Sequence, residues 1–246
     1  MKYSFIIPYY KRPSFRHTLS SFRKWYGGRN DFEIVVIEDY KNLEDEEQHE
    51  SLLRIMDEFK EFKFVFIVQD LHKCMCPSVS YNLGVKKSSG KFVILTNPEG
   101  YHNADVLRGL DDEFQRSVNK YVVCSCLNVK NFTMVDDSAK YDEDGWYQHS
   151  VHNKRKLNFC VAMTRHSYNR IQGFDENFRF GYARADADFL FKVIKNKIPI
   201  VERDDLMTLH IEHPREYGIS EEELNAKINV NREYLEKKWK GVDLWK

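Results

Sequence analysis

Asp186 and Asp188 stand two residues apart at the start of an apolar segment that predicts a helix from about Asp186 to Lys195. A turn sequence rich in Gly, Asp and Asn precedes them, from Gly173 to Gly181. A helix N-terminus favours carboxylates because its backbone N–H groups are unpaired, so either residue could simply cap the helix. A carboxylate at the entrance of a site can instead act as a general base. The rest of the chain decides between these interpretations.

Further acidic residues follow predicted strands. Glu38 and Asp39 directly follow one short apolar run, Glu99 closes the turn after another, and His210-Ile-Glu-His213 follows a late apolar segment. Carboxylates at adjacent strand ends can bind a base or ribose and hold a divalent cation against a diphosphate. For any single residue, hydrogen bonding to local backbone N–H groups is the simpler explanation. Their recurrence at one edge of a sheet favours a site.

The elements that would position these residues alternate along the first hundred residues. Short β-branched runs predict strands at 4–7, 33–37, 63–68 and 91–96, with predicted helices at 13–25, 43–62 and 77–87 between them. This order predicts an α/β fold with a doubly wound, mostly parallel, Rossmann-like sheet flanked by helices. Ligands of such sheets bind beyond the carboxyl ends of the strands, where the acidic residues fall.

Composition sets the limits of these interpretations. The chain has 246 residues, 42% of them hydrophobic, which is enough for one large α/β domain or two small ones. Its 38 basic and 38 acidic residues give no net charge, so nothing in the balance requires nucleic acid as a partner. No run is long and apolar enough for a transmembrane segment, and the N-terminus predicts a buried strand rather than a signal peptide. We therefore expect a cytoplasmic protein.

The five cysteines point to structural roles. The pairs Cys74/Cys76 and Cys124/Cys126 lack the Cys-x-x-Cys spacing of zinc sites. In a strand, residues two apart share one face, so Cys124 and Cys126 are expected in the core.

Two segments lie outside the alternating pattern. The polar stretch Asp136 to Gly145 predicts a long loop, and Trp146, Tyr147 and His149 follow it. Long loops are often binding elements and aromatic faces stack on the rings of ligands, so these residues are candidates for a binding site. The alternative for Trp146 is an anchor between loop and core. Residues 220–238 predict a charged terminal helix.

Several motifs together resemble those of a known family. They are Phe5-Ile-Ile-Pro-Tyr-Tyr-Lys-Arg12, Val35-Val-Ile-Glu-Asp39, Ser80-Tyr-Asn82-Leu-Gly84 with Gly90-Lys-Phe-Val-Ile94, Thr96-Asn-Pro-Glu99, and Gly173-Phe-Asp-Glu176 through Gly181 to Asp186-x-Asp188-Phe189. In this order the chain resembles a family 2 glycosyltransferase with the GT-A nucleotide-diphospho-sugar-binding fold. The resemblance covers roughly Tyr3 to Pro214, and the Asn-Pro-Glu variant of the Asp-x-Asp motif is similar to a bacterial and viral branch that acts on surface polysaccharides.

The resemblance implies a GT-A domain at 1–219, with a nucleotide-sugar half at about 1–100, an acceptor half at about 101–219, and a helical extension at 220–246. Asp39 would accept a hydrogen bond from the nucleobase of a nucleotide-diphosphate sugar, by default a UDP-sugar. Glu99 and His210, or less readily His213, would bind Mn²⁺ or Mg²⁺. The full donor-binding set that it implies is Pro8, Tyr9, Tyr10, Arg12, Asp39, Asn82 and Asn97.

The resemblance also implies a metal-dependent, inverting transfer in which Asp186 is the catalytic base. The acceptor would be a glycan or lipid-linked glycan, bound by Trp146, Tyr147, His149 and Asp188, and a lipid-linked acceptor would bring the protein to the membrane periphery. In this chain Ala185 stands where the family usually has a second acid, and Asp188 is also a candidate helix-cap or structural residue.

Two other functions remain open at this stage. A non-catalytic sugar-nucleotide-binding protein of the same fold would explain Ala185 and Asn97, and replacing Asp186 would distinguish it from an enzyme. A nucleotidyltransferase shares the sheet but usually has a Gly-rich phosphate loop after the first strand, where this chain has Tyr9-Tyr-Lys-Arg12.

Overall fold

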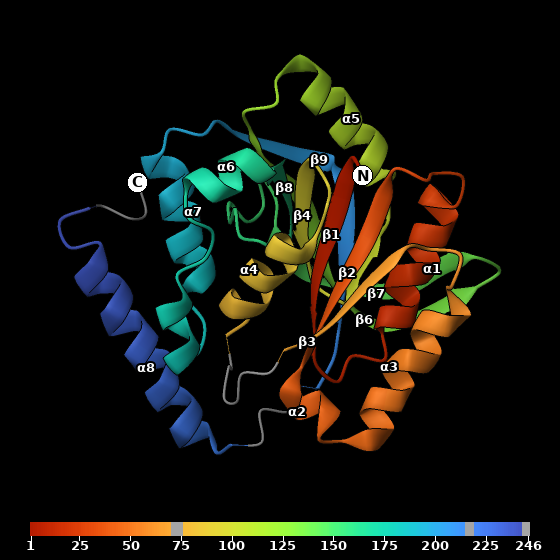
Figure 1. The fold of residues 1–246 in the computed structure, drawn as a ribbon, viewed down its shortest axis with the longest axis horizontal. Helices are drawn as coiled ribbons and strands as arrows, with labels where there is room; N and C mark the ends of the chain where they lie inside the picture. Colours follow the sequence, from red (N-terminus) through yellow and green to blue (C-terminus); the bar gives the residue numbers. More distant parts are fainter. Residues whose placement is uncertain (70–75, 215–218, 243–246) are drawn as a thin grey trace.

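One mixed sheet organises the computed structural model of the chain, which describes residues 1–69, 76–214 and 219–242 (Figure 1). The strand order is β3-β2-β1-β4-β8-β6-β9-β5, and β7 pairs with β6 outside this path. The strands are β1 Tyr3–Tyr9, β2 Phe32–Asp39, β3 Phe64–Gln69, β4 Phe92–Thr96, β5 Gly100–His102, β6 Tyr121–Val135, β7 Ser138–Gln148, β8 Cys160–Thr164 and β9 Ile200–Ile211.

Helices cover both faces of this sheet. They are α1 Phe15–Tyr26, α2 Tyr40–Leu43, α3 Glu46–Glu58, α4 Ser78–Lys87, α5 Val106–Arg116, α6 Arg165–Arg170, α7 Ala185–Lys195 and α8 Glu221–Lys238, with a short 3-10 helix η1 at Glu176–Phe180. In Figure 1, α1 and α3 lie on one side of the central strands, and α4, α6, α7 and α8 lie on the other. The predicted α/β class is therefore confirmed.

The parallel half of the sheet follows the prediction, and the other half adds antiparallel strands. β1 pairs in parallel with β2 and β4, and β2 pairs in parallel with β3. β8 then lies antiparallel between β4 and β6, while β9 runs parallel to β6 and antiparallel to β5. The turn between β4 and β5, which holds Glu99, thereby lies beside the end of β9, which holds His210.

Strand β1 shows why its sequence is continuously apolar. Phe5 and Ile7 face the core under α1 and α3, and Ile6 faces the core under α4 and α7. All three side chains are fully buried. A strand covered on both faces has no solvent side, so polar residues do not alternate with apolar ones.

The segment 136–145 differs from the predicted long loop. It belongs to a β-hairpin in which β6 and β7 pair through Val135↔Ser138. Asp136 and Asp137 form the two-residue turn with φ of 48° and 60°, a left-handed conformation that Asp tolerates better than most residues. Most of β7 is exposed. Its polar composition therefore looks like that of a loop.

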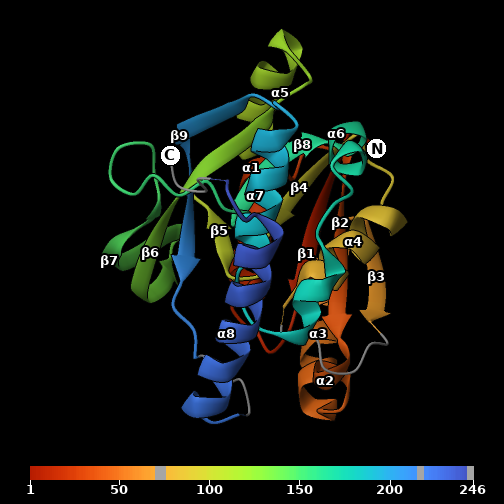
Figure 2. The same ribbon diagram turned by 90° about the vertical axis from the view of Figure 1, so that its left-hand side faces the viewer.

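The cysteine prediction holds where the structure describes it. Cys124 and Cys126 lie buried on β6 as free thiols, Cys160 is also a buried free thiol, and Cys76 is buried. Cys74 lies outside the described residues. The terminal helix predicted at 220–238 is α8, which lies beside α7 (Figure 2). Within the described ranges, no helix has the length and apolar character needed to cross a membrane.

Helix α4 lies directly on the sheet because residue 84 has no side chain. A Cβ at Gly84 would come within 2.6 Å of both Ile6 Cγ2 and Ile37 Cδ1, whereas a Cβ at Gly28 would meet nothing within 4 Å. We expect Gly84→Ala to lower the free energy of unfolding by about 1–3 kcal/mol through overpacking. Gly28→Ala is the matched control and should change it by less than about 0.5 kcal/mol. Urea denaturation measures both, and equal stabilities would contradict this packing.

Candidate active site

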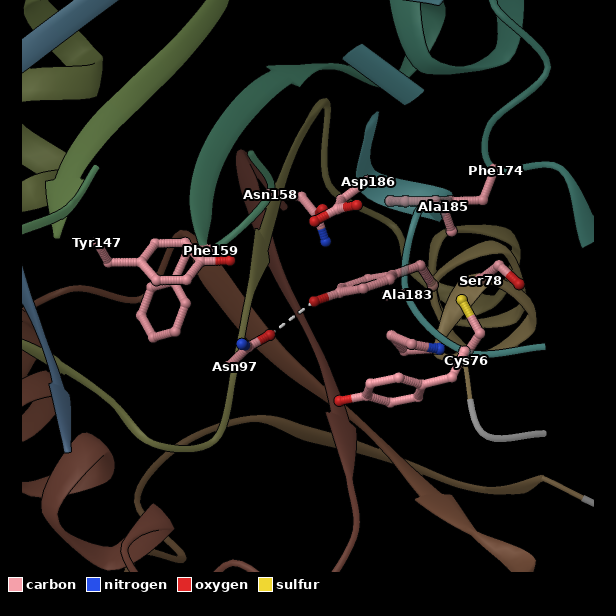
Figure 3. Close-up of a pocket in the computed structure, with 13 residues that line it drawn as sticks. Cys76, Ser78, Asn97, Tyr147, Asn158, Phe159, Phe174, Ala183, Ala185 and Asp186 are labelled. Carbon is pink, nitrogen blue, oxygen red and sulfur yellow. Dashed lines mark hydrogen bonds between the residues drawn. The ribbon is translucent and has the colours of Figure 1, made fainter. Parts of the chain in front are cut away.

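A pocket of about 300 Å³ lies at the carboxyl end of β4. The start of α4, the residues just after β4, the end of β7 and the start of α7 form its walls (Figure 3). The pocket occupies the position that the alternating sequence pattern predicts for a ligand site. Three predicted site residues line it: Asn97, Tyr147 and Asp186.

Asp186 lies in the first turn of α7, on the pocket wall. Its Oδ1 accepts a hydrogen bond of 2.8 Å from the backbone N–H of Ala187. Burial raises the pKa of this carboxyl above its ordinary value, and the neighbouring N–H groups, Arg184 and Arg155 oppose that shift only in part. A carboxylate with a raised pKa is a stronger base than an exposed aspartate.

The backbone ahead of Asp186 is unusual. Ala183 and Arg184 both have positive φ, at 59° and 70°. Residues with a Cβ rarely adopt this left-handed conformation, so two in succession indicate that surrounding contacts hold the segment in place.

Asn97 is held in the pocket by a buried tyrosine. Tyr81 donates from its hydroxyl to Asn97 Oδ1 at 2.9 Å, and its ring stacks on Phe174 with centroids 5.0 Å apart. The hydrogen bond fixes the orientation of the Asn97 amide, whose nitrogen can donate to a ligand.

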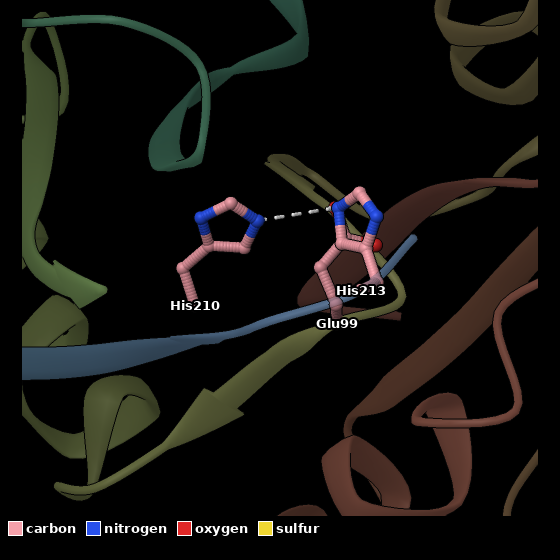
Figure 4. Close-up of side chains that lie close together, drawn as sticks. All are labelled: Glu99, His210 and His213. Atoms are coloured by element: carbon pink, nitrogen blue, oxygen red, sulfur yellow. Dashed lines mark ion pairs between the residues drawn. The ribbon is translucent and has the colours of Figure 1, made fainter. Parts of the chain in front are cut away.

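Glu99, His210 and His213 form a cluster of three side chains with ligand geometry (Figure 4). One ligand atom of each lies within 4.8 Å of the others. Glu99 Oε1 is 3.8 Å from His210 Nε2 and 3.6 Å from His213 Nε2. Both histidines therefore belong to the cluster, whereas the sequence analysis favoured His210 over His213.

Each imidazole is oriented through its other nitrogen. His210 Nδ1 donates to Asn128 Oδ1 at 2.8 Å, and His213 Nδ1 donates to the carbonyl oxygen of Pro214 at 3.0 Å. These bonds fix the tautomer and direct both Nε2 atoms toward Glu99. Histidines that bind metals are usually held in this way.

The electrostatics of Glu99 favour a charged carboxylate. Burial alone would raise its pKa, but the contact with His213 and the charges of His210 and Arg12 outweigh burial and lower it. Glu99 Oε2 is buried without a hydrogen-bond partner in the described part of the chain, 3.5 Å from Arg12 Nε. A carboxylate oxygen and two imidazole nitrogens form a donor set that fits a divalent cation such as Mn²⁺.

The cluster and the pocket share a wall. Tyr147 and Phe159 line the pocket, and their rings lie 5.9 Å and 4.8 Å from the ring of His210. A group bound at the cluster would therefore lie next to a molecule in the pocket.

The structure places the residues predicted for the nucleobase around the ends of β1 and β2, outside the pocket. Tyr9 is almost fully buried and packs on Phe15, so it belongs to the core. Pro8, Tyr10 and Asp39 are half-buried, and Asp39 pairs in register with Gln69 of β3.

Two predicted ligand-binding residues have structural contacts instead. Asn82 accepts from the Phe174 N–H and the Tyr168 hydroxyl and donates to the Phe174 carbonyl, which holds the turn ahead of η1. Asp188, expected at the acceptor, is fully buried and accepts from Trp239 Nε1 at 2.7 Å. Its alternative interpretation as a structural residue describes its observed position.

Trp146 and His149 also lie outside the pocket. Trp146 stacks on His152, with centroids 5.8 Å apart, and packs on a small apolar cluster between β6, β7 and β9. His149 packs against the same tryptophan. This packing agrees with the interpretation of Trp146 as an anchor.

Sequence reasoning missed several residues of the pocket and its surroundings. Tyr81 lies within the motif Ser80-Tyr-Asn82, so the sequence did contain a signal that this tyrosine is near the site. Asn158 and Phe159 line the pocket, and Asn128 orients His210, but none of them belongs to a recognisable pattern. Only the pairing of β4, β8, β6 and β9 brings these residues together.

The fold is that of an α/β protein of the GT-A class, and comparisons with known proteins identify its family. Residues 4–170 match the sequence model of the family described as glycosyl transferase family 2. The match covers more than half of the chain, which therefore belongs to this family. A search of curated proteins finds no significant match.

Solved structures share the fold at low sequence identity. S. aureus TarS 1–349 superposes with a TM-score of 0.65 at 17% identity, over 86% of this chain and 60% of that one. Its complex with UDP-GlcNAc superposes with a TM-score of 0.66 at 15% identity, over 96% of this chain and 67% of that one. The mannosyltransferase PcManGT from Pyrobaculum calidifontis, in complex with GDP-Man and Mn²⁺, gives 0.63 at 12% identity, over 88% and 58%. This chain thus spans about three fifths of the first TarS structure.

The raised pKa of Asp186 predicts a pH-dependent effect on stability. The folded state holds this proton more tightly than the unfolded state, so the stabilising contribution is present at low pH and lost as pH rises through the raised pKa. At pH 7 the ionised carboxylate therefore lowers stability. We expect Asp186→Asn to melt at a higher temperature than wild type at pH 7, with a difference that shrinks toward about pH 4.

The control for this prediction is Asp112→Asn, because Asp112 is exposed on α5. Thermal melts with chelator at both pH values measure the effect. Equal melting temperatures for Asp186→Asn and wild type at pH 7 would show that the carboxylate is not destabilised by its surroundings.

Proposed function

We propose that this chain is a metal-dependent, inverting glycosyltransferase. It moves a sugar from a nucleotide-diphosphate donor to a hydroxyl of a glycan or lipid-linked glycan, in the synthesis of a surface polysaccharide. The observation that carries the proposal is the wall that the Asp186 pocket shares with the Glu99–His210–His213 cluster. A base and a cation site on two sides of one pocket suit transfer from a diphosphate leaving group.

The donor is a UDP-sugar by default. TarS has been solved with UDP and with UDP-GlcNAc, and PcManGT with GDP-Man, so nucleotide sugars occupy this fold in both proteins. In this chain Asp39 would face the base, and Arg12 beside Glu99 would add positive charge near the diphosphate. Asn97 would donate to a sugar or ribose hydroxyl through its amide nitrogen.

Glu99, His210 and His213 would hold Mn²⁺ or, less well matched to imidazole, Mg²⁺. When bound, the cation supplies neutralisation of charge that develops on the departing diphosphate. Asn128 and the Pro214 carbonyl keep both imidazoles in the tautomer that binds a cation.

Asp186 would remove the proton of the acceptor hydroxyl. The acceptor oxygen forms a bond to the anomeric carbon while the bond from that carbon to the diphosphate oxygen breaks, and the proton passes to the Asp186 carboxylate. Attack opposite the leaving group inverts the anomeric centre, so no covalent intermediate with the protein is needed. Ala185 supplies no second carboxylate, which leaves acceptor orientation to other groups such as Tyr147.

The test is a thermal-shift panel of UDP-glucose, UDP-galactose, UDP-N-acetylglucosamine and GDP-mannose, each with Mn²⁺ and with chelator. A donor at 100 times its dissociation constant should stabilise wild type by about 2.7 kcal/mol, and Glu99→Ala should lose the metal-dependent part. Asp186→Asn should keep donor affinity and lose about 10²–10⁴-fold in rate of nucleotide release.

Each outcome separates the proposal from its alternative. Donor binding with no turnover in wild type would identify a non-catalytic sugar-nucleotide-binding protein. Full activity in Asp186→Asn would exclude this residue as the base, and shifts that persist in chelator would exclude metal dependence.

The role of His213 gives an independent prediction. His213→Ala removes a ligand rather than an outer contact, so Mn²⁺ affinity should fall by more than about 10–100-fold. His166→Ala, at an exposed position on α6, is the matched control and should bind like wild type. Isothermal titration calorimetry with Mn²⁺ alone measures the Mn²⁺ affinity of both variants. Unchanged affinity in His213→Ala would reduce the cluster to Glu99 and His210.

A further inference from the structure

Helix α8 makes polar as well as apolar buried contacts. It is highly charged, and Asn231 and Leu235 are its buried residues. Asn231 is 1% exposed. A buried amide needs hydrogen-bond partners, and the partners of Asn231 lie in the segment that leads into α7.

The first set of contacts lies just before Asp186. Asn231 Nδ2 donates to the carbonyl oxygens of Phe178 at 2.9 Å and Ala183 at 2.8 Å. The backbone N–H of Tyr182 donates to the Lys227 carbonyl at 3.1 Å. A Cβ at Gly181 would lie 2.4 Å from Asn231 Oδ1, so the segment and the helix are in close contact.

The second set lies just after Asp186. Asp188, two residues along α7, accepts from Trp239 Nε1 at 2.7 Å and pairs with Lys238 Nζ at 2.8 Å. Lys192 Nζ lies farther away, at 3.7 Å. Breaking a buried pair leaves an uncompensated charge, so Asp188 binds the first turn of α7 firmly to the end of α8.

The backbone between these contacts is strained. Ala183 and Arg184 hold positive φ directly ahead of Asp186, and such residues persist only where the surroundings over-determine them. The Asn231 bond to the Ala183 carbonyl acts on the first of these two residues. The polar contacts of α8 thus enclose the strained segment on both sides.

We infer that α8 positions the Asp186 carboxylate in the pocket, with Asn231 holding the segment before it and Trp239 and Lys238 holding Asp188 after it. The inference rests on the proposed function in that Asp186 is taken as the base. Asn231, Trp239 and Lys238 are positioning residues, since each acts on Asp186 through the backbone. The same contacts explain why Asp188 is an acid although it lies outside the pocket.

The experiment compares Asn231→Asp and Trp239→Phe with Asn229→Asp. Asn231→Asp keeps the size of the side chain and removes both amide donors, while Trp239→Phe removes the indole N–H and keeps a ring against Phe191. Asn229→Asp makes the same chemical change at an exposed position on the same helix. Hydrogen–deuterium exchange of residues 178–188, affinity for UDP with Mn²⁺, and nucleotide release from UDP-N-acetylglucosamine and GDP-mannose with water as the acceptor are measured for each.

We expect faster exchange in 178–188 for the two test variants and wild-type exchange for Asn229→Asp. The rate of nucleotide release should fall by about 100-fold in Asn231→Asp, because small displacements of a catalytic group have effects of this size. The affinity for UDP with Mn²⁺ should change by less than about threefold, since the lost interaction acts on the rate.

Three results would overturn the inference. The first is unchanged exchange in both test variants, and the second is a wild-type rate of nucleotide release in both while Asp186→Asn is inactive. The third is a loss of UDP affinity in proportion to the loss of the release rate. The last would indicate general damage to the fold. Should Asn231→Asp fail to fold, Trp239→Phe decides alone. A wild type that releases nucleotide from neither donor contradicts the proposed function instead, and exchange in 178–188 then decides whether α8 holds the segment.

Discussion

A buried carboxylate must be compensated by positive or polar neighbours, and the sheet has to bring such neighbours to Glu99. Its compensating groups come from distant parts of the chain, with Arg12 after β1 and His210 and His213 at and beyond the end of β9. Gly100, the residue after Glu99, pairs with His210 in the sheet. The antiparallel half of the fold therefore brings the imidazoles to the carboxylate, and the parallel half positions the carboxylate itself.

Strain and packing act together on the other side of the pocket. The left-handed residues Ala183 and Arg184 turn the chain into α7 so that Asp186 lies on the pocket wall. Such a conformation is unfavourable locally, and neighbouring contacts must hold it. The hydrogen bonds from α8 and the turn held by Asn82 both act near this segment. The stability of the C-terminal helix and the geometry of the site are thus linked.

The sequence predicted the parallel half of the fold because burial on both faces leaves a clear pattern of apolar runs separated by helices. It also selected Asn97, Tyr147 and Asp186, which line the pocket. It failed at residues 136–145, where a solvent-exposed hairpin has the polar composition of a loop. From the resemblance it named Asp186 as the base and left Asp188 between an acceptor contact and a structural residue, and only the fold shows that Asp188 packs against Trp239.

The contributions of Asn128, Asn158 and Phe159 were inaccessible for a different reason. Asn128 lies on β6, and Asn158 and Phe159 lie between β7 and β8, so their neighbours are set by strand pairings over long sequence distances. No local pattern encodes such contacts. The same holds for Asn231, because only its burial and its hydrogen bonds to two backbone carbonyls distinguish it from other asparagines.

Glu99 in the cluster and Asp186 in the adjoining pocket show how neighbouring sites can give two carboxylates opposite properties. Both experience burial, which raises a carboxyl pKa, but imidazoles and a guanidinium around Glu99 reverse the shift, whereas the opposing groups around Asp186 do not. Glu99 therefore remains an anion suited to a cation, and Asp186 becomes a carboxylate with increased proton affinity. Environments that separate the pKa values of two acids commonly mark a division of catalytic roles. This division follows from which strands and helices surround each residue, and it gives the proposed transfer a cation site and a base on two sides of the same pocket.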